Sequence, residues 1–259
     1  MVDSLSITLL TVSEILAIGV PVAFLIFFHR KFNVSWKHVL VGAVIFIVFA
    51  LVLEKLLHTY VLHMNPLTME WTKNPYLYAL YGGLAAGVFE EVGRFIGFRY
   101  ILRKSHDWKD GISYGIGHGG FESLFIGGLA IGGMLINVFM INSGAMDQTI
   151  HATTGDTAVT LRNLKNYLIN SPSIDFLLGG LERVFSFAFH LGASVLVLYA
   201  VRSKKIIFLF VAILTHAAID FVAGLSGQLK FNVFLVEGFL CLVAVISVIF
   251  IIKSKRFVF

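Results

Sequence analysis

The sequence predicts an all-α fold, a polytopic transmembrane helix bundle, and three observations support this prediction. Hydrophobic residues make up 58% of the 259 positions, charged residues make up only 14%, and the mean hydropathy is +0.87. In soluble domains about a quarter of the residues are charged. Because apolar windows of membrane-spanning length fill most of the chain, we expect a single transmembrane domain over residues 1–259.

Seven apolar windows can be placed along the chain. Each approaches the roughly 20 residues that span a hydrocarbon core of about 30 Å. They cover residues 6–28, 39–57, 76–98, 111–138, 175–201, 206–223 and 232–252. Asp3, rather than a basic residue, precedes the first window, which contains Pro21 and is not followed by a small-residue cleavage site. We therefore expect an uncleaved helix rather than a signal peptide.

The basic residues indicate how the bundle is oriented. Connections that fall on one side of the membrane hold 13 Lys and Arg residues, and those on the other side hold four. Short cytoplasmic loops carry the excess of basic residues, so we expect the N-terminus outside and the C-terminus on the cytoplasmic side. The long connection at 139–174 then becomes an exterior loop, with a short amphipathic helix expected around 159–168.

Composition also bounds the sites and partners. The single cysteine, Cys241, lies in an apolar run, which excludes a disulfide framework and a thiolate zinc cluster. The net charge of +5 comes from basic residues in the connections, where they set orientation, so no nucleic-acid partner is expected. The lipid bilayer is the expected environment, and the sequence leaves the oligomeric state unknown.

Glycines are concentrated in the third and fourth windows. They recur at four-residue spacing, as Gly83 and Gly87 and as Gly111, Gly115 and Gly119. Small residues at this spacing let helix backbones approach closely inside a membrane. We therefore expect tight helix packing along these two faces.

Four short polar motifs interrupt the apolar windows. They are Glu90-Glu91-Val92-Gly93-Arg94, His118-Gly119-Gly120-Phe121-Glu122, Glu182-Arg183 with His190, and His216-Ala217-Ala218-Ile219-Asp220. An ionisable side chain at membrane depth costs at least ~2.5–3.5 kcal/mol. Because this cost applies to each of these residues, we expect them to pair with one another or to serve a function. The first hypothesis is a buried polar centre inside the bundle.

The four motifs are expected to meet at one depth. Glu91, His118, His190 and His216 lie 8–12 residues from the basic residue at the cytoplasmic end of their windows. At a rise of ~1.5 Å per residue this places them about 12–18 Å into the membrane. The depths agree closely enough to predict one layer of polar side chains.

Rotation about the helix axes favours the same conclusion. Residues three, four or eight apart share one face of a helix. Such pairs are His118 with Glu122, His216 with Asp220, Glu90 with Arg94, and Glu182 with His190. Each window therefore directs several polar groups toward a shared interior site.

Imidazoles and carboxylates without thiols suit zinc, which binds nitrogen and oxygen ligands and leaves one position for water. The ion lowers the pKa of bound water toward ~7, and a nearby carboxylate can pass the proton to a leaving amine, as in a metallopeptidase. No His-Glu-x-x-His run is present, so the ligands must come from separate helices. Candidate ligands are His118, His190, His216, Glu122 and Glu182, and Glu122 and Asp220 are also suited to orienting ligand histidines.

These motifs resemble those of the CAAX-protease and bacteriocin-processing superfamily of intramembrane metalloproteases, most closely its YhfC-like branch. The resemblance covers about residues 76–223, which would form the catalytic core. The matching motifs are a glutamate pair before a basic residue (Glu90, Glu91, Arg94), an aromatic residue four before a histidine (Tyr114, His118), and a histidine four before Asn or Asp (His216, Asp220). The segment from Glu182 to His190 and the Gly-Gly-Phe-Glu tail after His118 resemble features of the YhfC-like branch.

The resemblance also implies roles for these residues. Glu91 would activate water, although two rather than three residues separate the glutamates from Arg94, which leaves Glu90 as the alternative base. His118 and His216 would bind the metal or the water, with His190 as a third ligand, and Asp220 would orient the site or stabilise the oxyanion. The implied reaction is hydrolysis of a peptide bond in a membrane-associated or lipidated substrate.

Other interpretations of the same residues stay open at this point. The buried acids and histidines could serve a proton-coupled transporter, although the chain shows no duplicated half. Two histidines could instead bind b-type haem, or the site could be the relic of an immunity or scaffold protein. Glu90 and Arg94 could form a structural ion pair, as could Glu182 and Arg183. Solvated loop positions are expected for His58, His63, His106 and His151.

Overall fold

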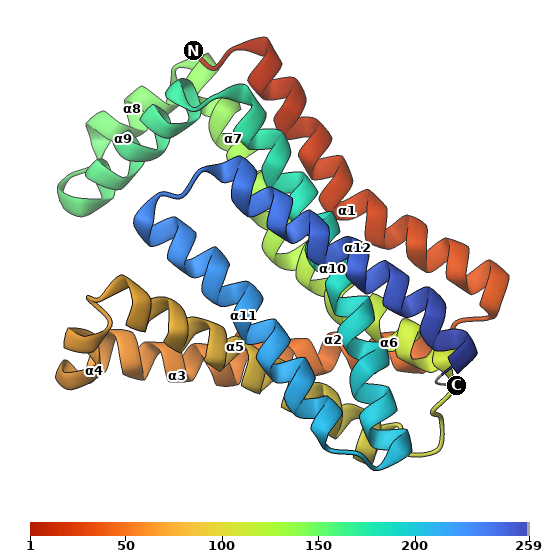
Figure 1. Cartoon of the computed structure of the whole chain (residues 1–259). Helices are drawn as coiled ribbons and strands as arrows, with labels where there is room; N and C mark the ends of the chain where they lie inside the picture. The colour runs from red at the N-terminus through yellow and green to blue at the C-terminus, as the bar shows by residue number, and fades with distance from the viewer. Residues whose placement is uncertain (258–259) are drawn as a thin grey trace. The chain divides into compact units, whose positions relative to one another are not determined.

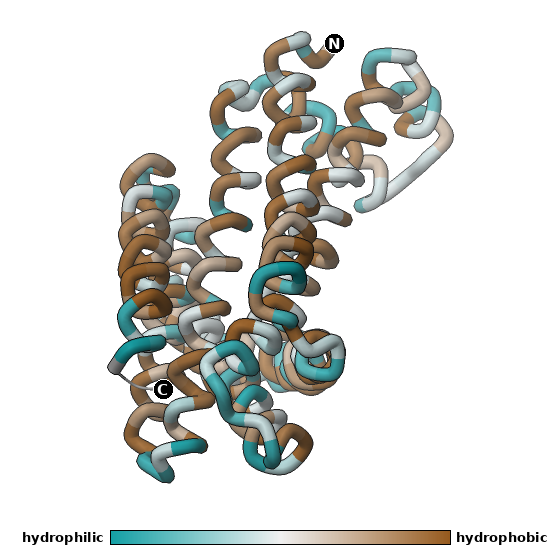
Figure 2. The backbone as a smooth tube through the Cα atoms, turned by 90° about the vertical axis from the view of Figure 1, so that its right-hand side faces the viewer, coloured by the Kyte–Doolittle hydropathy of each residue, from teal (hydrophilic) through white to brown (hydrophobic). Residues whose placement is uncertain are grey.

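The computed structural model describes residues 1–257, in which helices joined by short connections form the regular structure and no strand occurs (Figure 1). The all-α prediction is confirmed. Within residues 1–257, six helices are long and apolar enough to cross a membrane. They are Ser4–Phe32, Trp36–Met64, Trp108–Ser143, Ser173–Ser203, Ile207–Leu229 and Val233–Arg256. Figure 2 shows hydrophobic residues along these helices and hydrophilic residues gathered near their ends.

The third predicted span corresponds to α5 (Pro75–Ile96). It is not among the six apolar helices, because its polar motif lowers its hydropathy. Seven spans and the orientation of the termini therefore stay predictions. The start of α5 is well defined, since Pro75 occupies its first turn and the Asn74 side chain accepts a hydrogen bond from the Tyr76 N–H at 2.9 Å.

The observed helices extend beyond the predicted windows, because backbone hydrogen bonding continues past the apolar residues that mark a membrane crossing. The window at 39–57 lies within one continuous helix built from α2 and α3 with two π-helical stretches, η1 and η2. Their bounds are Trp36–Phe46 for α2, Ile47–Glu54 for η1, Lys55–Thr59 for α3 and Tyr60–Met64 for η2. The helix of α6 (Trp108–Glu122), η4 (Ser123–Gly128) and α7 (Leu129–Ser143) is similarly continuous.

The segment at 139–174 holds more helix than predicted. After α7 come α8 (Ala145–Ala152) and α9 (Gly155–Asn170), so the short helix expected at 159–168 is part of a longer one. Gly144 and Gly155 adopt φ values of 82° and 66° at the starts of these helices. Glycine reaches this left-handed region without the steric cost of a Cβ atom.

Packing divides the chain into two compact units. The first comprises Met1–Pro21 and Ser123–Val184, and the second comprises Val22–Glu122 and Phe185 to the end of the described chain. The helices α1 (Ser4–Phe32) and α10 (Ser173–Ser203) run through both units. The single domain expected from sequence stays a prediction.

The first unit contains a buried apolar cluster. Its members are Val2, Leu10, Ala17, Ile131, Val138, Ile141, Met146, Ile150, Leu168 and Phe176. Within the unit the Ser123 hydroxyl donates to the Ala17 carbonyl at 2.8 Å, and the Ser13 hydroxyl donates to the Phe176 carbonyl. Burial of this apolar surface, together with the two serine hydrogen bonds, stabilises this unit.

The second unit depends on close backbone approaches at glycine. A Cβ atom added to Gly87 of α5 would lie 2.6 Å from the Ile213 carbonyl oxygen of α11 (Ile207–Leu229). One added to Gly119 of α6 would lie 2.6 Å from the His190 Cβ of α10. Gly83, Gly111 and Gly115 make similar approaches. The packing predicted for the two glycine stripes is confirmed, and it brings the polar motifs together. The final helix, α12, covers Val233–Phe257.

Candidate metal centre

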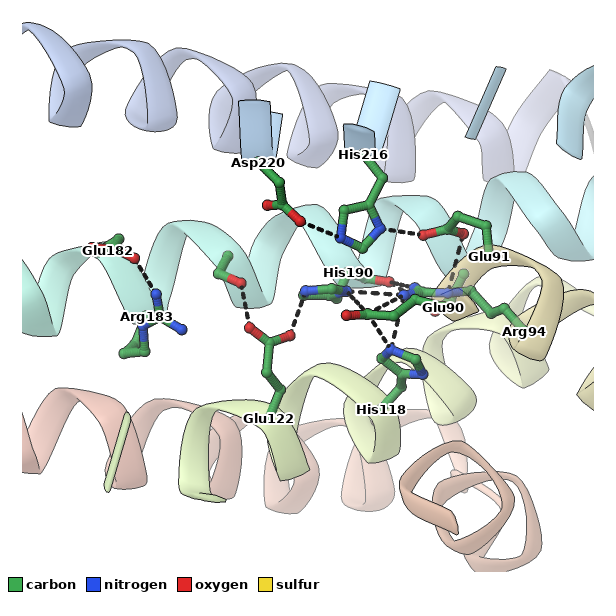
Figure 3. Close-up of polar contacts among 12 residues, drawn as sticks. Glu90, Glu91, Arg94, His118, Glu122, Glu182, Arg183, His190, His216 and Asp220 are labelled. Carbon is green, nitrogen blue, oxygen red and sulfur yellow. Dashed lines mark hydrogen bonds and ion pairs between the residues drawn. The ribbon is translucent and has the colours of Figure 1, made fainter. Parts of the chain in front are cut away.

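Four helices of the second unit place their polar motifs around one point (Figure 3). The contributing residues are Glu90, Glu91 and Arg94 of α5, His118 and Glu122 of α6, His190 of α10, and His216 and Asp220 of α11. The convergence expected from their depth and spacing is therefore present in the fold.

Burial separates these side chains into two groups. Glu91, Arg94 and His118 are fully buried, and His190, His216, Glu90 and Glu122 are 3–8% exposed. The Asp220 side chain, by contrast, is 37% exposed. Asp220 is thus the carboxylate of this cluster that is accessible from outside it.

Three of the buried residues form a group that could hold a metal ion. Glu90, His190 and His216 each offer one ligand atom, and these atoms lie within 4.8 Å of one another. The donor set is two imidazole nitrogens and one carboxylate oxygen, which matches the zinc sites of metallohydrolases. Divalent ions with harder preferences would favour more oxygen ligands.

Both histidines of this group have their other ring nitrogen on a buried carboxylate. His216 Nδ1 lies 2.8 Å from Glu91 Oε1, and His190 Nε2 contacts Glu122 Oε2. Glu122 is itself held by the Ser186 hydroxyl, which donates to Oε1 at 3.1 Å. If each histidine donates to its carboxylate, His216 Nε2 and His190 Nδ1 keep their lone pairs.

Arg94 lies between the helices as the buried counter-charge. Its Nη1 donates to the His190 carbonyl and to the Ser194 hydroxyl, both at 2.9 Å. Its Nε lies 3.2 Å from Glu91 Oε2, and its Nη2 lies 3.7 Å from Glu90 Oε2. One guanidinium thus faces more than one carboxylate, and a bound cation would offset the remaining negative charge.

Arg94 also contacts two of the imidazoles. Its Nη2 lies 2.9 Å from His190 Nδ1 and 3.0 Å from His118 Nε2. Ligation of a metal through His190 Nδ1 therefore requires this hydrogen bond to open. The donor types and their spacing therefore fit a metal ion, provided that the Arg94 guanidinium moves away from His190 Nδ1.

His118 holds Glu90 and is not part of the three-residue group. Its Nε2 lies 2.9 Å from Glu90 Oε2, and its Nδ1 is buried without a hydrogen-bond partner. Phe46 and Tyr114 pack against its ring, with centroids 5.2 and 5.9 Å away. This arrangement supports a positioning role more than the ligand role expected from sequence.

Glu182, another predicted ligand, contacts the Arg183 guanidinium (Figure 3). It belongs to the first compact unit and is not part of the three-residue group. Sequence reasoning missed Ser194, although it lies four residues after His190 on the same face of α10. Its hydroxyl donates to the His190 carbonyl at 2.7 Å and accepts from Arg94.

Comparisons with known proteins point to one family. The YhfC intramembrane metalloprotease family matches residues 16–240. The chain is also 38% identical over 258 residues, 99% of each chain, to the uncharacterized membrane protein YhfC of Bacillus subtilis strain 168. No solved structure matches it.

Proposed function

The chain belongs to the YhfC family of intramembrane metalloproteases, and we propose that it is a zinc-dependent endopeptidase of the bacterial cytoplasmic membrane. Its substrate is a membrane-associated or lipidated peptide. One observation carries the proposal: each histidine of the buried Glu90, His190 and His216 group rests its second nitrogen on a carboxylate. This pairing orients histidine ligands in metal sites and raises their basicity.

Glu90, His190 and His216 hold the ion in this proposal. When bound there, zinc would supply Lewis acidity for a substrate carbonyl and would lower the pKa of water toward neutrality. Glu91 and Glu122 position the two histidine rings. Burial of a carboxylate costs free energy. A role in helix packing alone is therefore a poor explanation for Glu91 and Glu122.

We assign proton transfer to Asp220. Its Oδ2 lies 3.4 Å from His216 Nε2, and its side chain is 37% exposed. Glu91, in contrast, is fully buried, with one oxygen on His216 and the other 3.2 Å from Arg94 Nε. The Asp220 carboxylate can accept a proton from the attacking water and return it to the leaving amine nitrogen. This assignment exchanges the roles that the family resemblance implied for Glu91 and Asp220.

Arg94 and His118 keep the catalytic groups in place. Arg94 ties α5 to α10 through the His190 carbonyl and Ser194, and His118 holds Glu90. Fixed positions of this kind lower the entropic cost of reaching the transition state. Neither residue needs to exchange a proton with the substrate.

The test is cleavage of quenched-fluorescence peptides by the purified protein in liposomes. The set should contain transmembrane-type peptides with and without a prenyl group. We expect cleavage that a zinc chelator abolishes and added zinc restores. His216→Ala should also abolish it, whereas the matched variant His151→Ala, at the exposed end of α8, should not.

Cleavage that persists after complete chelation would contradict the proposal. So would proton-coupled solute uptake into the liposomes that survives His216→Ala, because that result would favour a transporter. A Soret absorbance in the purified protein would instead indicate haem.

A further inference from the structure

A cavity of about 490 Å³ lies beside the metal centre, within the second compact unit. Its walls come from η1, α3, η2, α5 and α11, and Glu54, His58, Tyr81 and Gly82 are among the lining residues. This volume falls within the roughly 300–1,000 Å³ typical of ligand sites.

Asp220 connects the cavity to the metal centre. It lines the cavity, and its Oδ2 lies 3.4 Å from His216 Nε2. The other carboxylates of the centre are buried. A molecule in the cavity therefore meets the exposed carboxylate of the centre directly.

A chain of hydrogen bonds fixes one wall of the cavity. His58 Nε2 lies 3.0 Å from Glu54 Oε1, and His58 Nδ1 lies 2.8 Å from the Tyr81 hydroxyl. If the buried Glu54 is a carboxylate, which can only accept, then a neutral His58 donates to it and the Tyr81 hydroxyl donates to His58. The Tyr81 oxygen then keeps lone pairs for a further donor.

Small residues form another part of the lining. Ala79, Gly82 and Ala86 recur along one face of α5, and Gly224 of α11 lies near them. A Cβ atom added at Gly82 would meet no atom within 4 Å. Because no side chain larger than a methyl group projects from this part of the lining, a polypeptide main chain can approach it closely.

We propose that this cavity binds an extended polypeptide segment of the substrate. Main-chain N–H groups of that segment donate to the Tyr81 hydroxyl oxygen and the Asp220 carboxylate. The Glu54–His58 pair positions Tyr81, and the small-residue lining at Gly82 receives the main chain. This inference rests on the proposed protease function, since it names the place where the peptide lies.

The first test compares two identical substitutions with the peptide that the wild type cleaves. Gly82→Leu fills the cavity, whereas Gly133→Leu of α7 adds the same side chain at another position with no atom within 4 Å of its Cβ. We expect Gly82→Leu to raise KM by about tenfold or more without loss of zinc. The substitution removes binding that is equal in the ground state and the transition state, so KM should rise while kcat is unchanged. Gly133→Leu should match the wild type.

Tyr81→Phe tests the hydrogen bond itself. Loss of one such bond should raise KM by about 2–10-fold while kcat stays within about twofold. A purely structural role would lower the melting temperature and leave KM unchanged.

The second test does not depend on turnover. In a Cys241→Ser background, Gly82→Cys is labelled with a maleimide in zinc-stripped protein, with and without the peptide. We expect the peptide to slow labelling severalfold at position 82 and not in the Gly133→Cys control.

The outcomes separate the two proposals. If the wild type cleaves peptides but Gly82→Leu has a normal KM and the peptide does not protect Gly82→Cys, the cavity proposal is overturned and the protease function stands. If the wild type cleaves no peptide, both fall together.

Discussion

The two compact units use buried space in different ways. The first buries an apolar cluster and leaves its Asp147–Lys165 ion pair with 53% and 25% of the side-chain surfaces exposed. The second buries the full length of Arg94 together with Glu91 and His118. Exposed pairs contribute little and buried charges cost much. The second unit also has a buried apolar cluster, so the difference lies in the charges that it buries beside that cluster. We therefore expect substitutions in the two units to affect different measurements.

The largest effect is expected at Asp220. Asp220→Asn keeps the shape of the side chain and removes its basicity, so kcat should fall by about 10²–10⁴-fold. Zinc content and melting temperature should stay those of the wild type. Normal turnover in this variant, together with a loss of similar size in zinc-loaded Glu91→Gln, would show instead that Glu91 is the base.

A core substitution in the first unit should give the opposite pattern. Met146 is fully buried in the apolar cluster, and Met146→Ala should lower the free energy of unfolding by about 2–5 kcal/mol. Denaturant unfolding measures this loss. Peptide cleavage by the protein that remains folded should be unchanged, and a selective loss of kcat would break the division between the units.

Glu91→Gln should have a smaller effect, on metal affinity. The amide can still accept from His216 Nδ1, but it lacks the charge that raises the basicity of the ring. We expect the zinc affinity to fall by about 10–100-fold, measured by competition with a chromophoric chelator. An unchanged affinity would remove the positioning role given to Glu91.

The smallest effect is expected at the exposed pair of the first unit. The hydrogen bond from Lys165 lowers the pKa of Asp147, so the charged form contributes stability above the unfolded pKa, and this contribution is lost as the pH falls through the folded pKa. Asp147→Asn should therefore lower the melting temperature slightly at pH 7 and not at all once Asp147 is protonated. A difference that persists in acid would assign the effect to packing.

The helical class and the convergence of most of the buried polar residues could be predicted from the sequence for physical reasons. Charged residues are so costly in apolar windows that Glu90, Glu91, His118, His190 and His216 attract attention at once. Four-residue spacing then adds partners on the same helix face, as for Asp220. Both features can be read from short stretches of sequence, without knowledge of the tertiary packing.

Ligand grouping could not be predicted in the same way. Which imidazoles share an ion depends on how far α6 and α10 rotate against each other, and glycine contacts set that rotation. In the structure His118 contacts Glu90, whereas the group that fits a metal is completed by His190 and His216.

The hydropathy pattern does not reveal two further features of the structure. The polar helices α8 and α9 carry too few apolar residues to be seen as spans. The prediction of a solvated loop position for His58 is wrong, because the helix continues to Met64 and places His58 between Glu54 and Tyr81. The four-residue spacing of Glu54 and His58 was the available signal.

The most direct test of the account is the zinc content of purified variants, measured by inductively coupled plasma mass spectrometry. We predict stoichiometric zinc in the wild type, in His118→Gln and in the surface control His151→Ala, and its loss in both His190→Ala and His216→Ala. Zinc that survives in the His190→Ala, His216→Ala double variant, or that is lost only in His118→Gln, would contradict a metal centre built on Glu90, His190 and His216.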